Sequence, residues 1–211
     1  MPLTIEVWSD FACPWCYVGK QRLERALELF GDDVTVRRRS FELDPSAPHI
    51  GPAIAYAERL ARKYATSLER AEEMIRTMTA AGAAEGVELR FDRARPGNTF
   101  DAHRLMHLAA ERGRDAALEA RLFRAYLTEG EALGDRETLV RLAAEAGLGQ
   151  AELPGFLDGD EHAESVRADE EEARERGIGG VPFFLIEGRY GLSGAQPAEV
   201  LAEALGTARA G

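Results

Sequence analysis

The chain has 211 residues, of which 45% are hydrophobic and 30% charged, a composition typical of a folded globular protein and not of a disordered one. It carries 37 acidic against 26 basic side chains, a formal net charge of −11. This balance argues against nucleic acid and anionic membrane surfaces as partners, because both are bound through clustered Lys and Arg.

The N-terminal part of the chain reads as strand, helix, strand. Residues 3–8 form a short apolar run with no basic, apolar leader before it, so we expect a cytoplasmic protein. Residues 14–30 repeat apolar positions at helical spacing. Residues 33–43 begin with β-branched alternation and continue with three arginines, 37–39, which predicts a strand at the edge of a sheet.

The middle of the chain is mostly helical in pattern and contains no run that could span a membrane. A short extended piece at 87–91 interrupts the pattern. The expected helices are 52–65, 67–81, 98–113, 115–128, 135–146 and 160–176.

The tail returns to strand patterns. Residues 181–193 read as two strands around a Glu-Gly turn, and a last helix begins near Pro197. The order β-α-β, helical segment, β-β-α predicts an α/β fold with a four-stranded mixed sheet and the first strand inside it. We expect one domain from residues 1–48 and 178–211, and an all-helical insertion at 49–177.

The only two cysteines of the chain, Cys13 and Cys16, stand three residues apart between the first strand and helix. Pro14 suits the first helical position, which places Cys13 at the positive end of the helix. A thiolate is stabilised there, so the pKa of Cys13 should fall from about 8.5 into the range ~3.5–7.5. We expect Cys13 to attack and Cys16, more buried and with a more ordinary pKa, to resolve the mixed disulfide.

Three other interpretations of this pair explain less. A zinc site needs two further ligands, and the chain has no second C-x-x-C. A structural disulfide is rare in the reducing cytoplasm, and two inert buried thiols would not need Pro14.

The segments 9–20, 98–105, 180–184 and 194–197 resemble the thioredoxin-fold DsbA family, and within it a cytoplasmic FrnE-like branch related to 2-hydroxychromene-2-carboxylate isomerase. The resemblance extends over nearly the whole chain and implies a thioredoxin-like fold. It also implies a cis Val181–Pro182 peptide beside the dithiol, with Pro182 in the catalytic site. The Val181 backbone would then pair with an extended substrate segment.

One position departs from the thioredoxin pattern. The buried acid that many thioredoxin-like proteins carry six residues before the nucleophilic cysteine is replaced by Val7. Glu6 falls on the other face of the strand by alternation. Proton transfer at Cys16 is therefore expected to use water or Asp10, whose charge would raise the pKa of Cys13.

Aromatic residues and Pro14 surround the thiols in sequence and are candidates for substrate contact. We expect Trp15 inside the motif to be partly exposed and to touch substrate. Phe11 and Tyr17 fit a substrate-contacting rim and a packed core equally well.

The helix at 98–113 supplies a second group of candidates. The resemblance implies that its start faces the dithiol, so Asn98, Thr99, His103 and Arg104 would line a substrate cleft, although Asn98 serves equally well as a helix cap. His103, His107 and Glu111 share one face at a metal-ligating spacing. No fourth ligand is evident, and we expect no metal.

These features predict a thiol–disulfide oxidoreductase or isomerase that acts on protein or small-molecule disulfides through a mixed disulfide. No tightly bound cofactor is expected, and glutathione is a candidate redox partner. The alternatives are a glutathione-dependent isomerase or transferase for an aromatic or polyketide-like molecule, and a redox-switched binding protein. The substrate, the electron donor, the direction of catalysis and a candidate homodimer are left open by the sequence.

Overall fold

The computed structural model describes every residue except 1, 32 and 53, and forms two compact units, residues 1–43 with 164–211, and residues 44–163. The elements of the first unit are β1 (Leu3–Ser9), α1 (Pro14–Phe30), β2 (Val34–Ser40), α8 (Ala163–Glu175, whose first residue is the last of the second unit), β3 (Phe183–Ile186), β4 (Tyr190–Ser193) and α9 (Ala198–Ala210). Those of the second are α2 (Tyr56–Lys63), α3 (Leu68–Ala84), α4 (Phe100–Glu111), α5 (Asp115–Arg124), η1 (Ala125–Glu129), α6 (Arg136–Glu145) and α7 (Leu153–Asp158).

The first unit is built on a four-stranded mixed sheet in the order β2-β1-β3-β4. β1 runs parallel to β2, with Ser9 opposite Ser40, and antiparallel to β3, with Val7 opposite Phe184. β4 pairs antiparallel with β3. The predicted α/β fold is confirmed, including the interior position of β1 and the edge position of the arginine-rich β2. The division of the chain at residues 48 and 178 stays a prediction.

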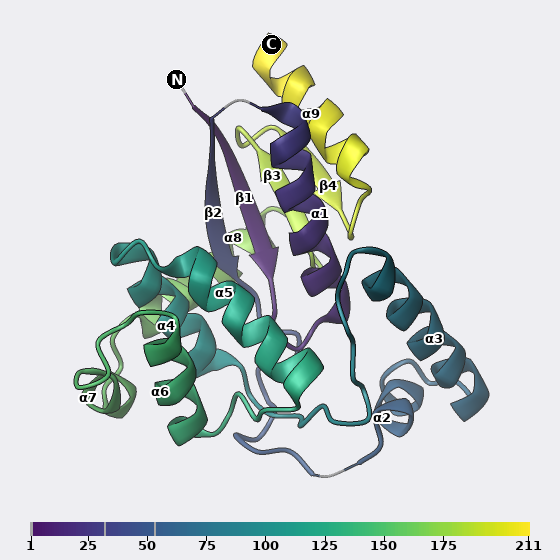
Figure 1. Cartoon of the computed structure of the whole chain (residues 1–211), viewed down its shortest axis with the longest axis vertical. Coiled ribbons are helices and arrows are strands. Elements are labelled where there is room, and N and C mark those ends of the chain that lie inside the picture. The colour runs from purple at the N-terminus through teal and green to yellow at the C-terminus, as the bar shows by residue number, and fades with distance from the viewer. Residues whose placement is uncertain (1, 32, 53) are drawn as a thin grey trace. The chain divides into compact units, whose positions relative to one another are not determined.

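The alternation of β1 buries side chains on both faces of this sheet, which gives the unit three layers. On one face, Figure 1 shows α1 and α9 side by side over the strands. On the other face, Trp8 packs with Ala173 of α8, Ile178 and Leu185. The first face has the larger core, formed by Leu3, Ile5, Val7, Leu23, Ala26, Phe184, Ile186, Ala198, Leu201 and Leu205.

Polar side chains fix α8 against the sheet edge. Asp169 accepts hydrogen bonds from Arg39 Nη1 at 2.8 Å and from the Ser40 backbone N–H at 2.9 Å. The Trp8 indole N–H donates to the Asp169 carbonyl at 3.0 Å. Arg39 also donates from Nε to Glu6 at 2.9 Å, so the charges in this buried region are paired.

The second unit consists of helices, and three of them differ from the sequence prediction. The first helix is confined to Tyr56–Lys63; of the expected span 52–65, residue 53 lies outside the described residues. The expected helix 115–128 is divided into α5 and the π-helical turn η1. The Leu127 carbonyl, in the last turn of this π helix, accepts the Arg90 N–H at 2.7 Å and so anchors residues 87–91. The short helix α7 was not expected.

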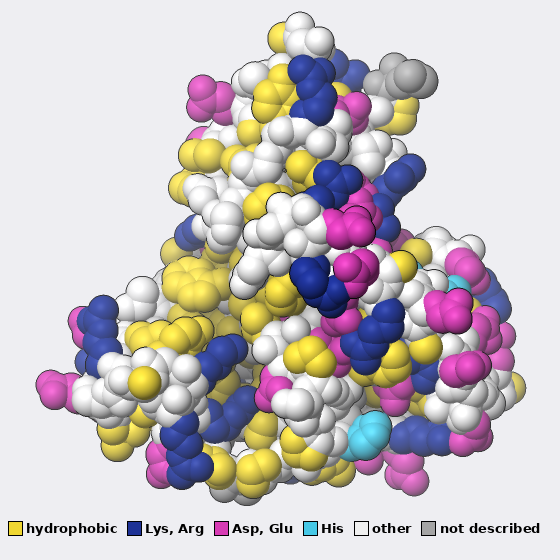
Figure 2. Space-filling view, turned by 180° about the vertical axis from the view of Figure 1, so that it is seen from behind, with side chains coloured by type: hydrophobic (Ala, Val, Ile, Leu, Met, Phe, Trp, Pro, Cys, Tyr) yellow, Lys and Arg dark blue, Asp and Glu magenta, His cyan; other side chains and the backbone are white. Residues whose placement is uncertain are grey.

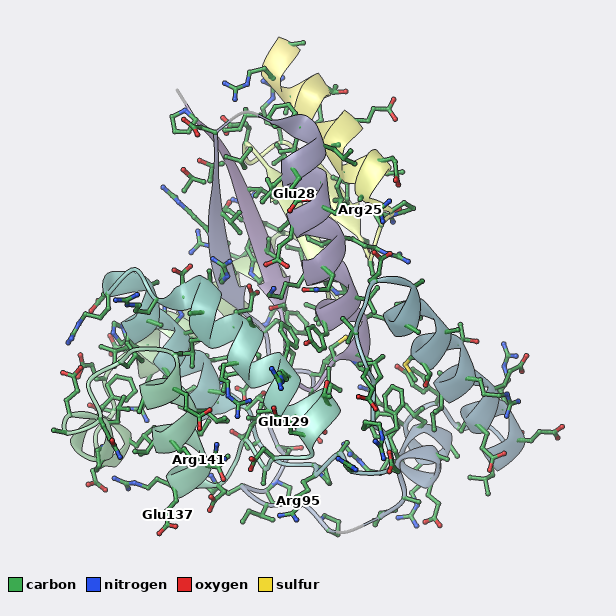
Figure 3. All side chains as sticks on the ribbon, viewed as in Figure 1. Arg25, Glu28, Arg95, Glu129, Glu137 and Arg141 are labelled. Carbon is green, nitrogen blue, oxygen red and sulfur yellow. The ribbon has the colours of Figure 1, made fainter. Side chains whose placement is uncertain are left out.

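Basic and acidic side chains are interspersed on the surface seen in Figure 2 and do not form a field of one sign. Arg141 of α6, labelled in Figure 3, is an example: it pairs with Glu131 at 2.8 Å and with Glu145 at 2.9 Å. In the described part of the chain, none of the helices combines the length and apolar character needed to cross a bilayer.

Candidate active site

The loop between β1 and α1 delivers Cys13 to the start of a helix. Cys13 is the N-cap of α1 with an extended backbone (φ −95°, ψ 112°), and Pro14 occupies the first turn, as the sequence predicts. The Cys13 N–H donates to the Asp10 carbonyl at 3.0 Å, which closes the loop. The Cys13 carbonyl in turn accepts the N–H of Cys16 at 3.1 Å. The sulfur of Cys13 therefore lies at the positive end of the helix.

The segment before β3 forms the second wall of the site. The Val181–Pro182 peptide is cis, and Cys13 Sγ lies 3.6 Å from the Val181 carbonyl oxygen. Gly19, inside α1, is missing from the sequence prediction of the site. A Cβ at this position would lie 3.0 Å from Pro182 Cγ, so only glycine allows the helix this close to Pro182 without a shift. The unexplained glycine within a helical pattern was the available signal.

The two thiols are free, buried and electrostatically unequal. The hydrogen bond from the Cys16 side chain, helped by the backbone N–H groups of Cys16 and Trp15, lowers the pKa of Cys13 against the opposing effects of burial and the Asp10 charge. Burial, followed by the hydrogen bond to Cys13, raises the pKa of Cys16 well above its usual range. The direction for Cys13 is the predicted one, whereas the Cys16 thiol is far from the ordinary pKa expected of it.

Asp10 is the first residue of the loop between β1 and α1, and only 1% of its surface is exposed. Its Oδ1 accepts the Ala12 N–H at 3.1 Å, and its Oδ2 accepts the Leu43 N–H at 2.7 Å. Val7 is in the apolar core, and Glu6 pairs with Arg39, in agreement with strand alternation. Of Glu6, Val7 and Asp10, only Asp10 is among the groups that shift the pKa values of the two cysteines.

The aromatic residues of the motif divide between surface and interior. Trp15 and Tyr17 are partly exposed and have surface to offer a substrate. Phe11 is 2% exposed, so in this structure it belongs to the packed interior and not to a rim.

The remaining predicted contacts lie in the second unit. Asn98 caps α4, since its Oδ1 accepts the Phe100 N–H at 2.8 Å, and His103 is buried. Arg104 does not line a cleft: it is buried and donates to the carbonyls of Phe156, Gly159 and Glu161 and to the carboxylate of Asp101. The roles of Asn98 and His103 toward a substrate stay predictions.

The histidine pair predicted on α4 does not form a metal site with Glu111; His107 instead contacts another histidine, His162. His107 stacks on His162 with ring centroids 5.8 Å apart, and His162 Nε2 lies 3.6 Å from Glu111 Oε1. Within the described ranges 2–31, 33–52 and 54–211, no group of three or more His, Cys, Asp or Glu side chains is placed to hold a metal ion.

Comparisons with known proteins show the family of the chain. Residues 4–206 match the family described as "DSBA-like thioredoxin domain". The chain is 31% identical over 208 residues to the uncharacterized protein YwbO of Bacillus subtilis (strain 168), covering 97% of this chain and 96% of that protein.

Two solved structures extend the comparison. The probable DsbA oxidoreductase SCO1869 of Streptomyces coelicolor superimposes with a TM-score of 0.92 at 45% identity, over 99% of this chain and 90% of that one. The cytosolic disulfide reductase DsbM of Pseudomonas aeruginosa shares the fold, with a TM-score of 0.69 at 21% identity over 99% of this chain and all of that one (100%). The resemblance stated from the sequence is thereby confirmed at the level of the family. The chain belongs to the DsbA-like thioredoxin-domain family.

Proposed function

We propose that this chain is a thiol–disulfide oxidoreductase that uses Cys13 as nucleophile and Cys16 as resolving thiol, and that it works as a reductase. The observation that carries the proposal is the inequality of the two thiols, with the pKa of Cys13 lowered and that of Cys16 raised. Such a pair favours a thiolate at Cys13 and a protonated thiol at Cys16 that hydrogen-bonds to it.

The chemistry takes place in two exchanges. The Cys13 thiolate attacks one sulfur of a substrate disulfide, the substrate S–S bond breaks, and the other substrate sulfur leaves as a thiolate that takes up a proton. Cys16 then loses its proton and attacks Cys13 Sγ, which breaks the mixed disulfide and releases the second substrate thiol. The substrate gains two electrons and two protons, and the protein ends with a Cys13–Cys16 disulfide. Two external thiols restore the dithiol by the reverse exchanges.

The surroundings of Cys13 support binding of an extended substrate. We assign substrate contact to Pro14, to the partly exposed Trp15, and to the Val181 backbone next to Pro182. The name and structures of DsbM support the direction and the redox partner, since that protein is described as a cytosolic disulfide reductase and has been solved with GSH. We accordingly propose glutathione as the reductant and the cytoplasm as the site of action.

Trapping the mixed disulfide tests the proposal. Cys16→Ser should accumulate an adduct with glutathione disulfide or a disulfide-bonded peptide, visible as the added mass, because no resolving thiol remains. Cys13→Ser should form no adduct and should abolish reductase turnover, while Ser46→Ala, an exposed loop change, serves as the control with wild-type behaviour. Full turnover in Cys13→Ser would contradict the mechanism. Stoichiometric glutathione binding without any redox change of the cysteines would instead favour the glutathione-dependent isomerase.

A further inference from the structure

The buried carboxylate of Asp10 is held in place by the backbone on both of its oxygens. Oδ1 accepts the N–H of Ala12, and Oδ2 accepts the N–H of Leu43, the last residue before the second unit. Hydrogen bonds from N–H groups to both oxygens stabilise the ionised form of a carboxylate. In the loop that carries Cys13, these two bonds favour the negatively charged form of Asp10 against the opposing effect of its burial.

The same residue is bonded directly to the dithiol segment. Its carbonyl accepts the N–H of Cys13 at 3.0 Å, and only Phe11 and Ala12 separate the two residues in the chain. With Asp10 almost fully buried, water screens its interaction with a nearby sulfur only weakly. The charge of Asp10 raises the pKa of both cysteines, and for Cys13 it opposes the helix N-terminus.

This charge acts unequally on the two redox states. In the dithiol state the Cys13 thiolate is a second negative charge close to the Asp10 carboxylate, and the two repel. In the disulfide state both sulfurs are neutral and the repulsion is absent. The carboxylate thus raises the free energy of the dithiol state alone, which strengthens its tendency to give up electrons.

We propose that Asp10 is a positioning residue that biases the Cys13–Cys16 couple toward the disulfide and so keeps the protein a reductant. The proposal rests on the proposed function, because it assumes that this couple is the working redox pair. It assigns Asp10 no contact with substrate.

Two neutral variants test the charge separately from the fold. Asp10→Asn keeps the side-chain shape, and Asp10→Ser keeps an oxygen that can accept the Ala12 N–H in the same kind of turn. Each is equilibrated with glutathione buffers of stepped ratio, and the fraction of dithiol is read by alkylation and mass. We expect the equilibrium constant to shift about tenfold toward the dithiol in both variants, equivalent to a potential about 30 mV less negative.

A second readout does not depend on a disulfide. Thiolate absorbance at 240 nm should show the Cys13 titration moving to lower pH in both variants. Glu6→Gln is the matched control: it also converts a buried acid to its amide, so it should lower the urea midpoint and leave the equilibrium constant and the titration within about twofold of wild type.

The outcomes separate the two proposals. If both Asp10 variants keep the wild-type equilibrium and titration, the inference about Asp10 is overturned while the dithiol mechanism stands. If the wild type forms no Cys13–Cys16 disulfide in any buffer, the proposed function fails, and the titration alone decides whether Asp10 acts on Cys13. A potential that follows the loss in urea midpoint, with Glu6→Gln shifting equally, would show a structural effect and also overturn the inference.

Discussion

Asp169→Asn tests how α8 is fixed to the sheet edge that supports the site. The carboxylate is 2% exposed and satisfies both Arg39 Nη1 and the Ser40 N–H. Asparagine keeps the shape but removes the charge and replaces one acceptor oxygen by a donor. One of the two partners must therefore lose its hydrogen bond.

The expected loss in the free energy of unfolding follows from the groups that Asp169→Asn leaves without a partner. The Ser40 N–H is buried, and a buried donor without an acceptor costs about 1–3 kcal/mol. Breaking a fully buried ion pair costs about 3–5 kcal/mol. The Arg39 side chain is 26% exposed and keeps Glu6 and Glu172, so we expect roughly 1–2 kcal/mol for this part. Together the free energy of unfolding should fall by about 2–5 kcal/mol, a large share of the ~5–15 kcal/mol of a typical protein.

Urea unfolding followed by tryptophan fluorescence measures this loss, because Trp8 is buried and donates to the Asp169 carbonyl. The control is Glu171→Gln on the same helix, where the pair with Arg174 is exposed and should contribute at most about 0.5 kcal/mol. If Asp169→Asn stays within about 0.5 kcal/mol of wild type, the carboxylate does not fasten the helix as argued.

Three further changes have expected outcomes. Iodoacetamide should modify Cys13 below the pH that an ordinary thiol needs, because its lowered pKa keeps it a thiolate there, whereas Cys16 should react only after denaturation; equal rates in the native protein would contradict the inequality. Arg104→Met leaves three carbonyls without their donor and should lower the free energy of unfolding by about 3–5 kcal/mol in urea titrations; a loss near zero would argue against its structural role. Gly19→Ala should cost about 1–3 kcal/mol and slow disulfide reduction, as the new methyl group meets Pro182; wild-type stability and rate would show that the helix yields freely.

The sequence predicts those parts of the fold that depend on patterns of neighbouring residues. The apolar run at residues 3–8 predicted a strand, and Pro14 predicted where the helix begins and hence where Cys13 lies. The three arginines of β2 predicted an edge strand, and the strand order confirms it. Each of these signals acts within a few residues of the feature it predicts.

The parts that the sequence did not predict depend on partners far along the chain. Nothing in the acidic pattern of 160–176 indicates that Asp169 bonds to Ser40, 129 residues away. The buried role of Arg104 likewise needs carbonyls 52 to 57 residues further on. A charged residue whose hydrogen-bond partners are far away in the sequence has the same local pattern as one that faces solvent. For this reason the sequence prediction placed Arg104 in a cleft.

The contrast between the two cysteines shows how three residues of separation can produce opposite chemistry. At the N-cap of α1, the hydrogen bond from the Cys16 side chain and those from the backbone N–H groups of Cys16 and Trp15 lower the pKa of Cys13, and together they outweigh burial. One turn later the N–H groups are already used inside the helix, so burial dominates at Cys16 and keeps its proton on. Helix position alone would make the Cys13 thiolate very stable and the protein an oxidant. Burial and the Asp10 carboxylate both oppose the lowering of the Cys13 pKa, and of the two only Asp10 does so with a charge that a substitution can remove.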